Sequence, residues 1–274
     1  MSKASEEAQK QLDRIVALGY PDVADMSAAA FRSLARPLIR ALEDCSDEAG
    51  LGTQILLVPT RELVSPESLI ARTSINRMAG FTTMPPRDIA SFLPQDGFEP
   101  PEGPFYLVVE PHTGTCYINR EPDVARKLID SDERLPLTLE EGLAIATQHP
   151  EWLLEKNGFN LLGSRSADGR VPSIWMSQNA PRLGAVWPNS RHTWLGNATA
   201  WPVAASVSFA DSDKSLFSRG PAQQPPNRVS DRAARHRART QQCGADLRPA
   251  QLVAHADQSV TQWSSKNTRN SLLE

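Results

Sequence analysis

The hydrophobic pattern that could build a folded core runs through the first 198 residues and then stops. Residues 199–274 contain no isoleucine and include the segment PAQQPPNRVSDRAARHRARTQQ (221–242), which is rich in proline, glutamine and arginine. A segment of such low hydrophobicity cannot bury enough apolar surface to offset the entropy lost on ordering. We therefore predict one folded domain over residues 1–198 and a disordered low-complexity tail over residues 199–274.

The net charge also differs between the predicted domain and the predicted tail. Residues 199–274 hold ten Lys and Arg and six Asp and Glu, a net charge of +4, which leaves −7 for residues 1–198. An acidic domain argues against a nucleic-acid partner, because phosphate contacts require Lys and Arg.

Other sequence features concern the compartment. Cys45, Cys116 and Cys243 are too few and too far apart for a disulfide framework or a zinc site. The charged N-terminus lacks the apolar segment of a signal peptide, and the apolar runs at 55–59 and 105–109 are far too short to span a membrane. We expect a cytoplasmic protein with no membrane partner.

Two amphipathic helices are predicted at the N-terminus. The first carries Leu12, Ile15, Val16 and Leu18 at helical spacing and ends at Gly19; the second begins after the cap residue Ser27. Pro37 should kink or split the second helix near residue 36. Further helices are predicted after Ser65, around residues 87–92, from the Thr138–Glu141 capping box to Gln148, and after Pro150.

Six strands complete the predicted domain. The run at 53–59 has the continuous apolar character of a buried strand, and residues 80–84 form a weaker one. Residues 105–119 read as a hairpin that turns at His112–Gly114. The connection from 53–59 to 105–109 is long enough for parallel pairing. With short Trp-rich strands at 172–177 and 182–187, this predicts an α+β fold: N-terminal helices packed on a small mixed sheet, then a Trp-rich β segment.

Several blocks of sequence resemble one known family. These blocks are LGYPDVADMSAAAFRSLARPL (18–38), TGTCYINREPD (113–123), LPLTLEEGLAI (135–145), GSRSADGRVPSIWMS (163–177) and HTWLG (192–196). Together they resemble an actinobacterial family of domains of unknown function, over about residues 10–198. The resemblance implies a bacterial cytoplasmic protein and assigns no activity.

The resemblance also bears on the tail. Relatives end soon after the HTWLG block, whereas this chain continues for 78 residues beyond it. We hypothesise that the tail is out-of-frame or read-through sequence. Inspection of the coding DNA tests this, because an alternative frame should then supply a short, family-like ending.

Arg165, Asp168 and Arg170 form the densest polar cluster of the predicted domain. Two guanidinium groups could bind a carboxylate or phosphate ligand. A tight turn at Asp168-Gly169, with the arginines paired to nearby acids, explains the same residues and is favoured.

His192, Trp175 and Trp194 are the other candidate ligand-binding residues. His192 could act as a general base, although a histidine packed beside tryptophans is favoured. The tryptophans could line a pocket or a contact surface, and we favour a core role with one or two at an interface. Glu110 and His112 lack a third metal ligand, so we predict neither a metal site nor a cofactor.

Two classes of function remain open. A non-catalytic binding or regulatory module is preferred, because the sequence shows no nucleophile–base pair, phosphate loop or metal cluster. The alternative is an enzyme or small-anion-binding domain that uses the Arg, Asp and His residues of 164–194. The corresponding partners would be a protein or a small anionic ligand.

Overall fold

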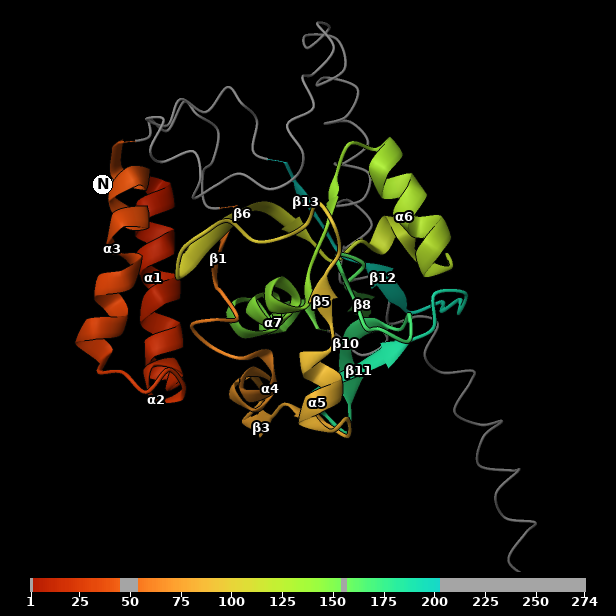
Figure 1. The fold of residues 1–274 in the computed structure, drawn as a ribbon, viewed down its shortest axis with the longest axis horizontal. Coiled ribbons are helices and arrows are strands. Elements are labelled where there is room, and N and C mark those ends of the chain that lie inside the picture. Colours follow the sequence, from red (N-terminus) through yellow and green to blue (C-terminus); the bar gives the residue numbers. More distant parts are fainter. Residues whose placement is uncertain (1, 45–53, 154–156, 203–274) are drawn as a thin grey trace, which may run out of the picture. The chain divides into compact units, whose positions relative to one another are not determined.

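The computed structural model of the protein describes residues 2–44, 54–153 and 157–202 (Figure 1). These residues lie within one compact unit, Met1–Ala222. The predicted α+β class, with N-terminal helices packed on mixed sheets, is confirmed. The predicted tail from residue 203 onward lies outside the described residues, and the frame-change hypothesis therefore stays a prediction.

The N-terminal helices are α1 (Lys3–Ala17), α2 (Tyr20–Val23) and α3 (Ala28–Asp44), and α1 packs beside α3 (Figure 1). The Ser27 hydroxyl caps α3 by accepting the Ala30 N–H at 3.1 Å. Pro37 does not split the helix, because α3 continues through it. Pro37 and Ser33 are exposed, so water can satisfy the Ser33 carbonyl that lacks its helical donor.

One antiparallel sheet has the strand order β1 (Ile55–Pro59), β6 (Phe105–His112), β13 (Thr199–Trp201) and β7 (Leu135–Pro136). The first two strands pair antiparallel, although the connection between them is long enough for parallel pairing: Ile55 lies opposite Val109 and Pro59 opposite Phe105. A long connection permits parallel pairing but does not require it.

The hairpin predicted over residues 105–119 was also wrong. Gly114 adopts a left-handed conformation with φ of 71°, and the chain then enters the 3-10 helix η3 (Thr115–Tyr117) instead of a return strand. The position beside β6 is filled by β13, from the far end of the described chain. A local turn signal could not reveal this pairing, because the partner strand is about 90 residues away along the chain.

Strand β13 corrects the domain boundary that was predicted at residue 198. Ala198 is buried, and its N–H donates to Asn160 O at 2.9 Å while its carbonyl accepts the Leu137 N–H at 3.0 Å. The chain thus passes directly from one sheet into the other at Ala198. Residues 199–201 complete the core sheet and belong to the folded domain.

The second large sheet is mixed and has the order β12 (Leu195–Asn197), β8 (Gly158–Asn160), β10 (Val171–Ser177), β11 (Ala180–Val186) and β4 (Phe81–Thr82). The Trp-rich strands predicted at 172–177 and 182–187 correspond to β10 and β11. Gln178 and Asn179 join them with φ values of 54° and 61°, as in the two-residue turn that suits the twist of a hairpin.

Smaller elements connect these sheets. The helix predicted after Ser65 and that around 87–92 are present as α4 and α5. After Pro150 the structure has only the 3-10 helix η4, which ends at Trp152, and residues 154–156 lie outside the described ranges. Helix α6 was not predicted. The bounds are α4 (Pro66–Leu69), η2 (Ile70–Arg72), β2 (Ser74–Ile75), β3 (Met78–Ala79), α5 (Pro86–Ala90), β5 (Leu93–Pro94), α6 (Pro122–Ser131), η4 (Pro150–Trp152) and β9 (Ser164–Arg165).

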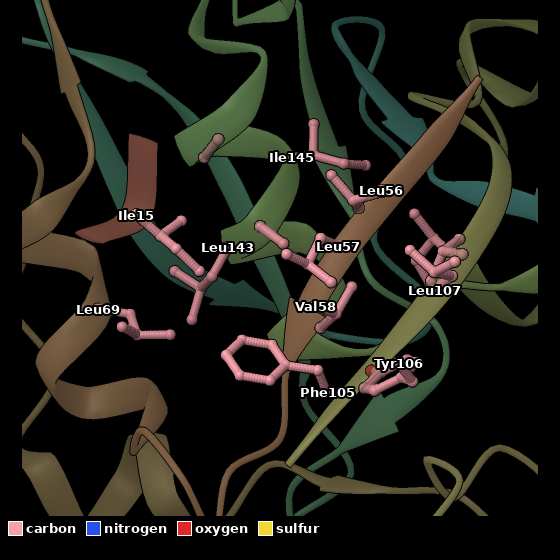
Figure 2. Close-up of a cluster of buried hydrophobic side chains, with 14 of the residues drawn as sticks. Ile15, Leu56, Leu57, Val58, Leu69, Phe105, Tyr106, Leu107, Leu143 and Ile145 are labelled. Carbon is pink, nitrogen blue, oxygen red and sulfur yellow. The ribbon is translucent and has the colours of Figure 1, made fainter. Parts of the chain in front are cut away.

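Helix α7 (Leu139–Gln148) lies at the centre of the fold, and all ten of its residues are buried. Its predicted capping box is present, with the Glu141 carboxylate accepting the Thr138 N–H at 2.8 Å. Leu143 and Ile145 face the side chains of β1 in the core (Figure 2). Helix α7 therefore contributes to the core on every side.

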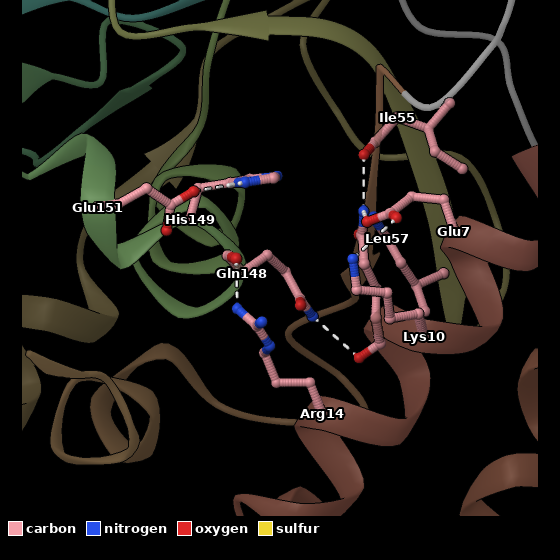
Figure 3. A network of polar contacts seen from close by, with 9 residues as sticks. Glu7, Lys10, Arg14, Ile55, Leu57, Gln148, His149 and Glu151 are labelled. Atoms are coloured by element: carbon pink, nitrogen blue, oxygen red, sulfur yellow. Dashed lines mark hydrogen bonds and ion pairs between the residues drawn. The ribbon is translucent and has the colours of Figure 1, made fainter.

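A glutamine closes the free edge of the antiparallel sheet. Gln11, which is 2% exposed, donates its Nε2 to Ile55 O at 2.8 Å and accepts the Leu57 N–H on its Oε1 at 2.7 Å. Gln148 then donates to the Gln11 carbonyl at 3.0 Å, and Arg14 donates to the Gln148 carbonyl at 2.5 Å (Figure 3). The side-chain amide thus replaces a neighbouring strand and satisfies buried backbone groups of β1.

Gly114 provides a test of this architecture. A Cβ there would lie 1.7 Å from Asn197 O, on the backbone of β12, so alanine must displace the chain that links the two sheets. We expect Gly114→Ala to lower the free energy of unfolding by more than about 4 kcal/mol in a denaturant titration.

Gly169→Ala is the matched control. Gly169 also has a positive φ, of 87°, but a Cβ there would meet no atom within 4 Å. The control should therefore lose about 1–2 kcal/mol from the left-handed conformation alone. Equal losses in the two variants would contradict the close approach.

Candidate functional site

The two faces of the five-stranded sheet have different roles. Ile174 of β10 and Leu183 of β11 lie opposite each other, are fully buried and belong to the main core. The residues next to these two along their strands point to the other face of the sheet. There Trp175 lies opposite Arg182, and Arg182 lies opposite Phe81 of β4. These three side chains form a row across neighbouring strands, and each is half-buried.

Three aromatic rings meet on this outer face. The ring centroids of Trp175 and Trp194 are 6.0 Å apart at an interplanar angle of 71°, and those of His192 and Trp194 are 5.6 Å apart at 67°. Both are edge-to-face arrangements, which are favourable for aromatic pairs. We call the partly exposed set Phe81, Trp175, Arg182, His192 and Trp194 the aromatic face.

Glycine makes the aromatic face flat. A Cβ at Gly184 would lie 2.2 Å from the Cη2 atom of Trp175, so the indole lies directly over the bare backbone of β11. A Cβ at Gly158 would likewise lie 2.5 Å from the Trp175 Cβ. Larger residues at either position would push the indole off the sheet.

Arg182 is held between two rings of this face. Its guanidinium carbon lies 5.4 Å from the centroid of Trp175 and 5.7 Å from that of Phe81, within cation–π range. Its Nη2 donates to the Thr83 hydroxyl at 3.2 Å. Within the described residues, no carboxylate lies at ion-pair distance from Arg182.

The predicted arginines do not share a ligand-binding position. Arg165 pairs with Asp123 of α6 at 2.8 Å. Arg170 pairs instead with Asp168 at 2.7 Å and with Asp88 at 3.6 Å. Each guanidinium therefore has its own carboxylate.

Asp168 stabilises a tight turn, which is the explanation that the sequence analysis favoured over a ligand-binding cluster. Its Oδ1 accepts the Ser166 hydroxyl at 2.5 Å and the Arg170 N–H at 3.2 Å, while the Gly169 N–H donates to Ser166 O. The hydrogen bond from Ser166, followed by those from Arg170, lowers the pKa of Asp168. This arrangement stabilises the negative carboxylate that the turn uses.

The structure thus brings together three of the six predicted residues: Trp175, Trp194 and His192. Sequence reasoning missed Arg182 and Phe81. A signal for Arg182 was present, because a two-residue turn at Gln178-Asn179 fixes the register of β10 against β11 and places Arg182 opposite Trp175.

Glu110 and His112 have structural partners of their own. The Glu110 carbonyl accepts Arg134 Nη2 at 2.9 Å, and His112 Nδ1 accepts the Gly114 N–H at 2.8 Å. Among residues 2–44, 54–153 and 157–202, no group of three or more His, Cys, Asp or Glu is arranged to hold a metal ion. No described helix combines the length and hydrophobicity needed to cross a membrane.

The protein is thus an α+β domain with a two-sheet core and an aromatic outer face on its mixed sheet. It belongs to DUF5701, a family of unknown function whose family model matches residues 14–206. This match includes β13, in agreement with the corrected domain boundary. Comparison with curated proteins and with solved structures gives no match.

His112 predicts a pH dependence of stability. Burial of the ring, aided by the positive charge of Arg134, lowers the pKa of His112 from 6.5 to about 4. Between pH 6.5 and pH 4 the unfolded chain binds a proton that the folded chain does not. Stability should be complete above pH 6.5 and fall by about 1–3 kcal/mol as the pH drops toward 4, after allowance for solvent screening of the half-buried ring.

The measurement is the free energy of unfolding against pH for the wild type and His112→Asn. The asparagine Oδ1 can accept the Gly114 N–H in place of Nδ1 but does not titrate. The wild type should therefore lose more stability than the variant in this pH window. Parallel curves would show that His112 is not responsible.

Proposed function

We propose that this protein is a non-catalytic binding module that contacts a protein partner through the aromatic face. The observation that carries this proposal is the edge-to-face contact of Trp175, Trp194 and His192, left partly exposed on a sheet whose other face packs against the main core. Tryptophan and arginine are enriched among the residues that dominate binding energy at protein interfaces. Rigid aromatic side chains also lose little conformational entropy when a partner binds.

The alternative function, an enzyme or small-anion site of Arg165, Asp168, Arg170 and His192, has less support. Such a site needs side chains that converge on one reacting or binding position. Arg165 and Arg170 instead neutralise different carboxylates, and the ring contact of His192 is with Trp194.

The proposal includes the cytoplasmic location and the actinobacterial origin expected from the sequence. Three widely separated cysteines, Cys45, Cys116 and Cys243, are typical of a protein from a reducing compartment. The sequence blocks that resemble the actinobacterial family support the origin.

Removal of one indole tests the proposed surface. The immobilised full chain and its Trp194→Ala variant are compared by quantitative mass spectrometry of the proteins retained from an extract of the source cells. Loss of an aromatic residue at the centre of an interface costs about 2 kcal/mol or more, so the variant should retain its specific partner at least ~10-fold less well.

Trp187→Ala is the matched control. Trp187 is 53% exposed, follows the end of β11 and is not part of the aromatic face. This variant should retain the partner like the wild type, and both variants should unfold near the wild-type temperature. The same proteins retained in the same amounts by all three chains would refute the proposed surface.

A further inference from the structure

Unlike Arg165 and Arg170, Arg182 has no carboxylate at ion-pair distance among the residues that the structure describes. Arg165 and Arg170 hold carboxylates at 2.8 and 2.7 Å, whereas the guanidinium of Arg182 contacts two rings and one hydroxyl. Its Nη1 makes no hydrogen bond to the described residues and, unlike the buried Nε, remains accessible. A charged donor is thus fixed in direction at the surface without its preferred acceptor.

The rings determine how Arg182 can act. The rings of Trp175 and Phe81 flank the guanidinium at cation–π distance and restrict its motion, so less side-chain entropy is lost when an anion binds. Arg182 is also partly buried, and lower exposure to water strengthens a charge-assisted hydrogen bond. Apolar surface from Trp175 lies directly beside this donor, and Trp194 extends it beyond Trp175.

We propose that the aromatic face binds an acidic segment of a protein partner, with Arg182 holding a carboxylate and Trp175 and Trp194 packing against a neighbouring apolar side chain. This inference rests on the proposed function and specifies the chemistry of its partner. The inference is based on chemical complementarity. The Arg182 guanidinium can bind an anion, and the rings of Trp175 and Trp194 can pack against an apolar group. The net charge of −7 over residues 1–198 opposes non-specific capture of acidic chains, so this local contact supplies the selectivity.

Two short peptides test the inference on the unmodified full chain. The probes are acetyl-DFD-amide and its neutral counterpart acetyl-NFN-amide, titrated by isothermal calorimetry at low ionic strength. A hydrogen bond to a charged group is worth about 1.5–3 kcal/mol, so the acidic peptide should bind at least ~10-fold more tightly than the neutral one. Equal binding of the two peptides by the wild type would overturn the inference.

Variants of Arg182 assign the preference to this residue. Arg182→Gln removes the charge and should abolish the preference for the acidic peptide. Arg182→Lys keeps the charge without the planar stacking and should retain part of it. Circular dichroism and thermal unfolding verify that the variants are folded. A preference that persists in Arg182→Gln would place the anion contact elsewhere and overturn the inference.

Competition and mass measurements distinguish other occupants. Displacement of the acidic peptide by inorganic phosphate, at matched ionic strength and low millimolar concentration, would assign the site to a free small anion. A dimer in native mass spectrometry that is lost in Arg182→Gln would assign it to a second copy of this chain. Either result overturns the peptide assignment. If Trp194→Ala loses its partner while Arg182→Gln leaves peptide preference unchanged, the proposed function survives and this inference fails.

Discussion

The complete burial of α7 is the constraint on which the rest of the structure depends. A helix with no exposed residue must find internal partners for its polar side chains, since an unpaired buried charge is costly. Burial raises the pKa of Glu140, and Arg61 opposes this by donating its Nε at 2.7 Å, while Arg61 also donates to the Phe92 carbonyl. At the other end of the helix, Gln148 bonds the backbone of α1. Both ends of α7 are thereby tied to different parts of the chain.

The position of α7 also determines which side of the mixed sheet is exposed. Its first N–H groups lie beside β9, where the Ser164 hydroxyl accepts the Leu139 N–H at 3.0 Å, and the helix packs against β10. The inner side chains of β10 and β11 are buried by this core. Trp175 and Arg182 therefore project outward, and the aromatic face is a consequence of how the core is filled.

Local sequence signals predicted local structure well. The capping box of α7, the cap at Ser27 and the two Trp-rich strands all depend on residues a few positions apart, and all are present. The failures involve distant segments. The hairpin after β6 failed because β13 occupies that position, and complete burial of α7 could not be read from its short apolar pattern. Half of the predicted site comes together, because Trp175 lies on β10 and Trp194 and His192 precede β12 in the same sheet. The acids that neutralise Arg165 and Arg170 include residues from remote segments.

The central claim is that partners bind on the aromatic face, and the indole N–H resonances of the full chain test it most directly. Six tryptophans give six such signals, which single Trp→Phe substitutions assign. On titration with acetyl-DFD-amide, the account predicts that the signals of Trp175 and Trp194 shift together while those of Trp152 and Trp187 stay in place. Unchanged signals from Trp175 and Trp194, with shifts at Trp152 or Trp187, would place binding on another surface and contradict the account.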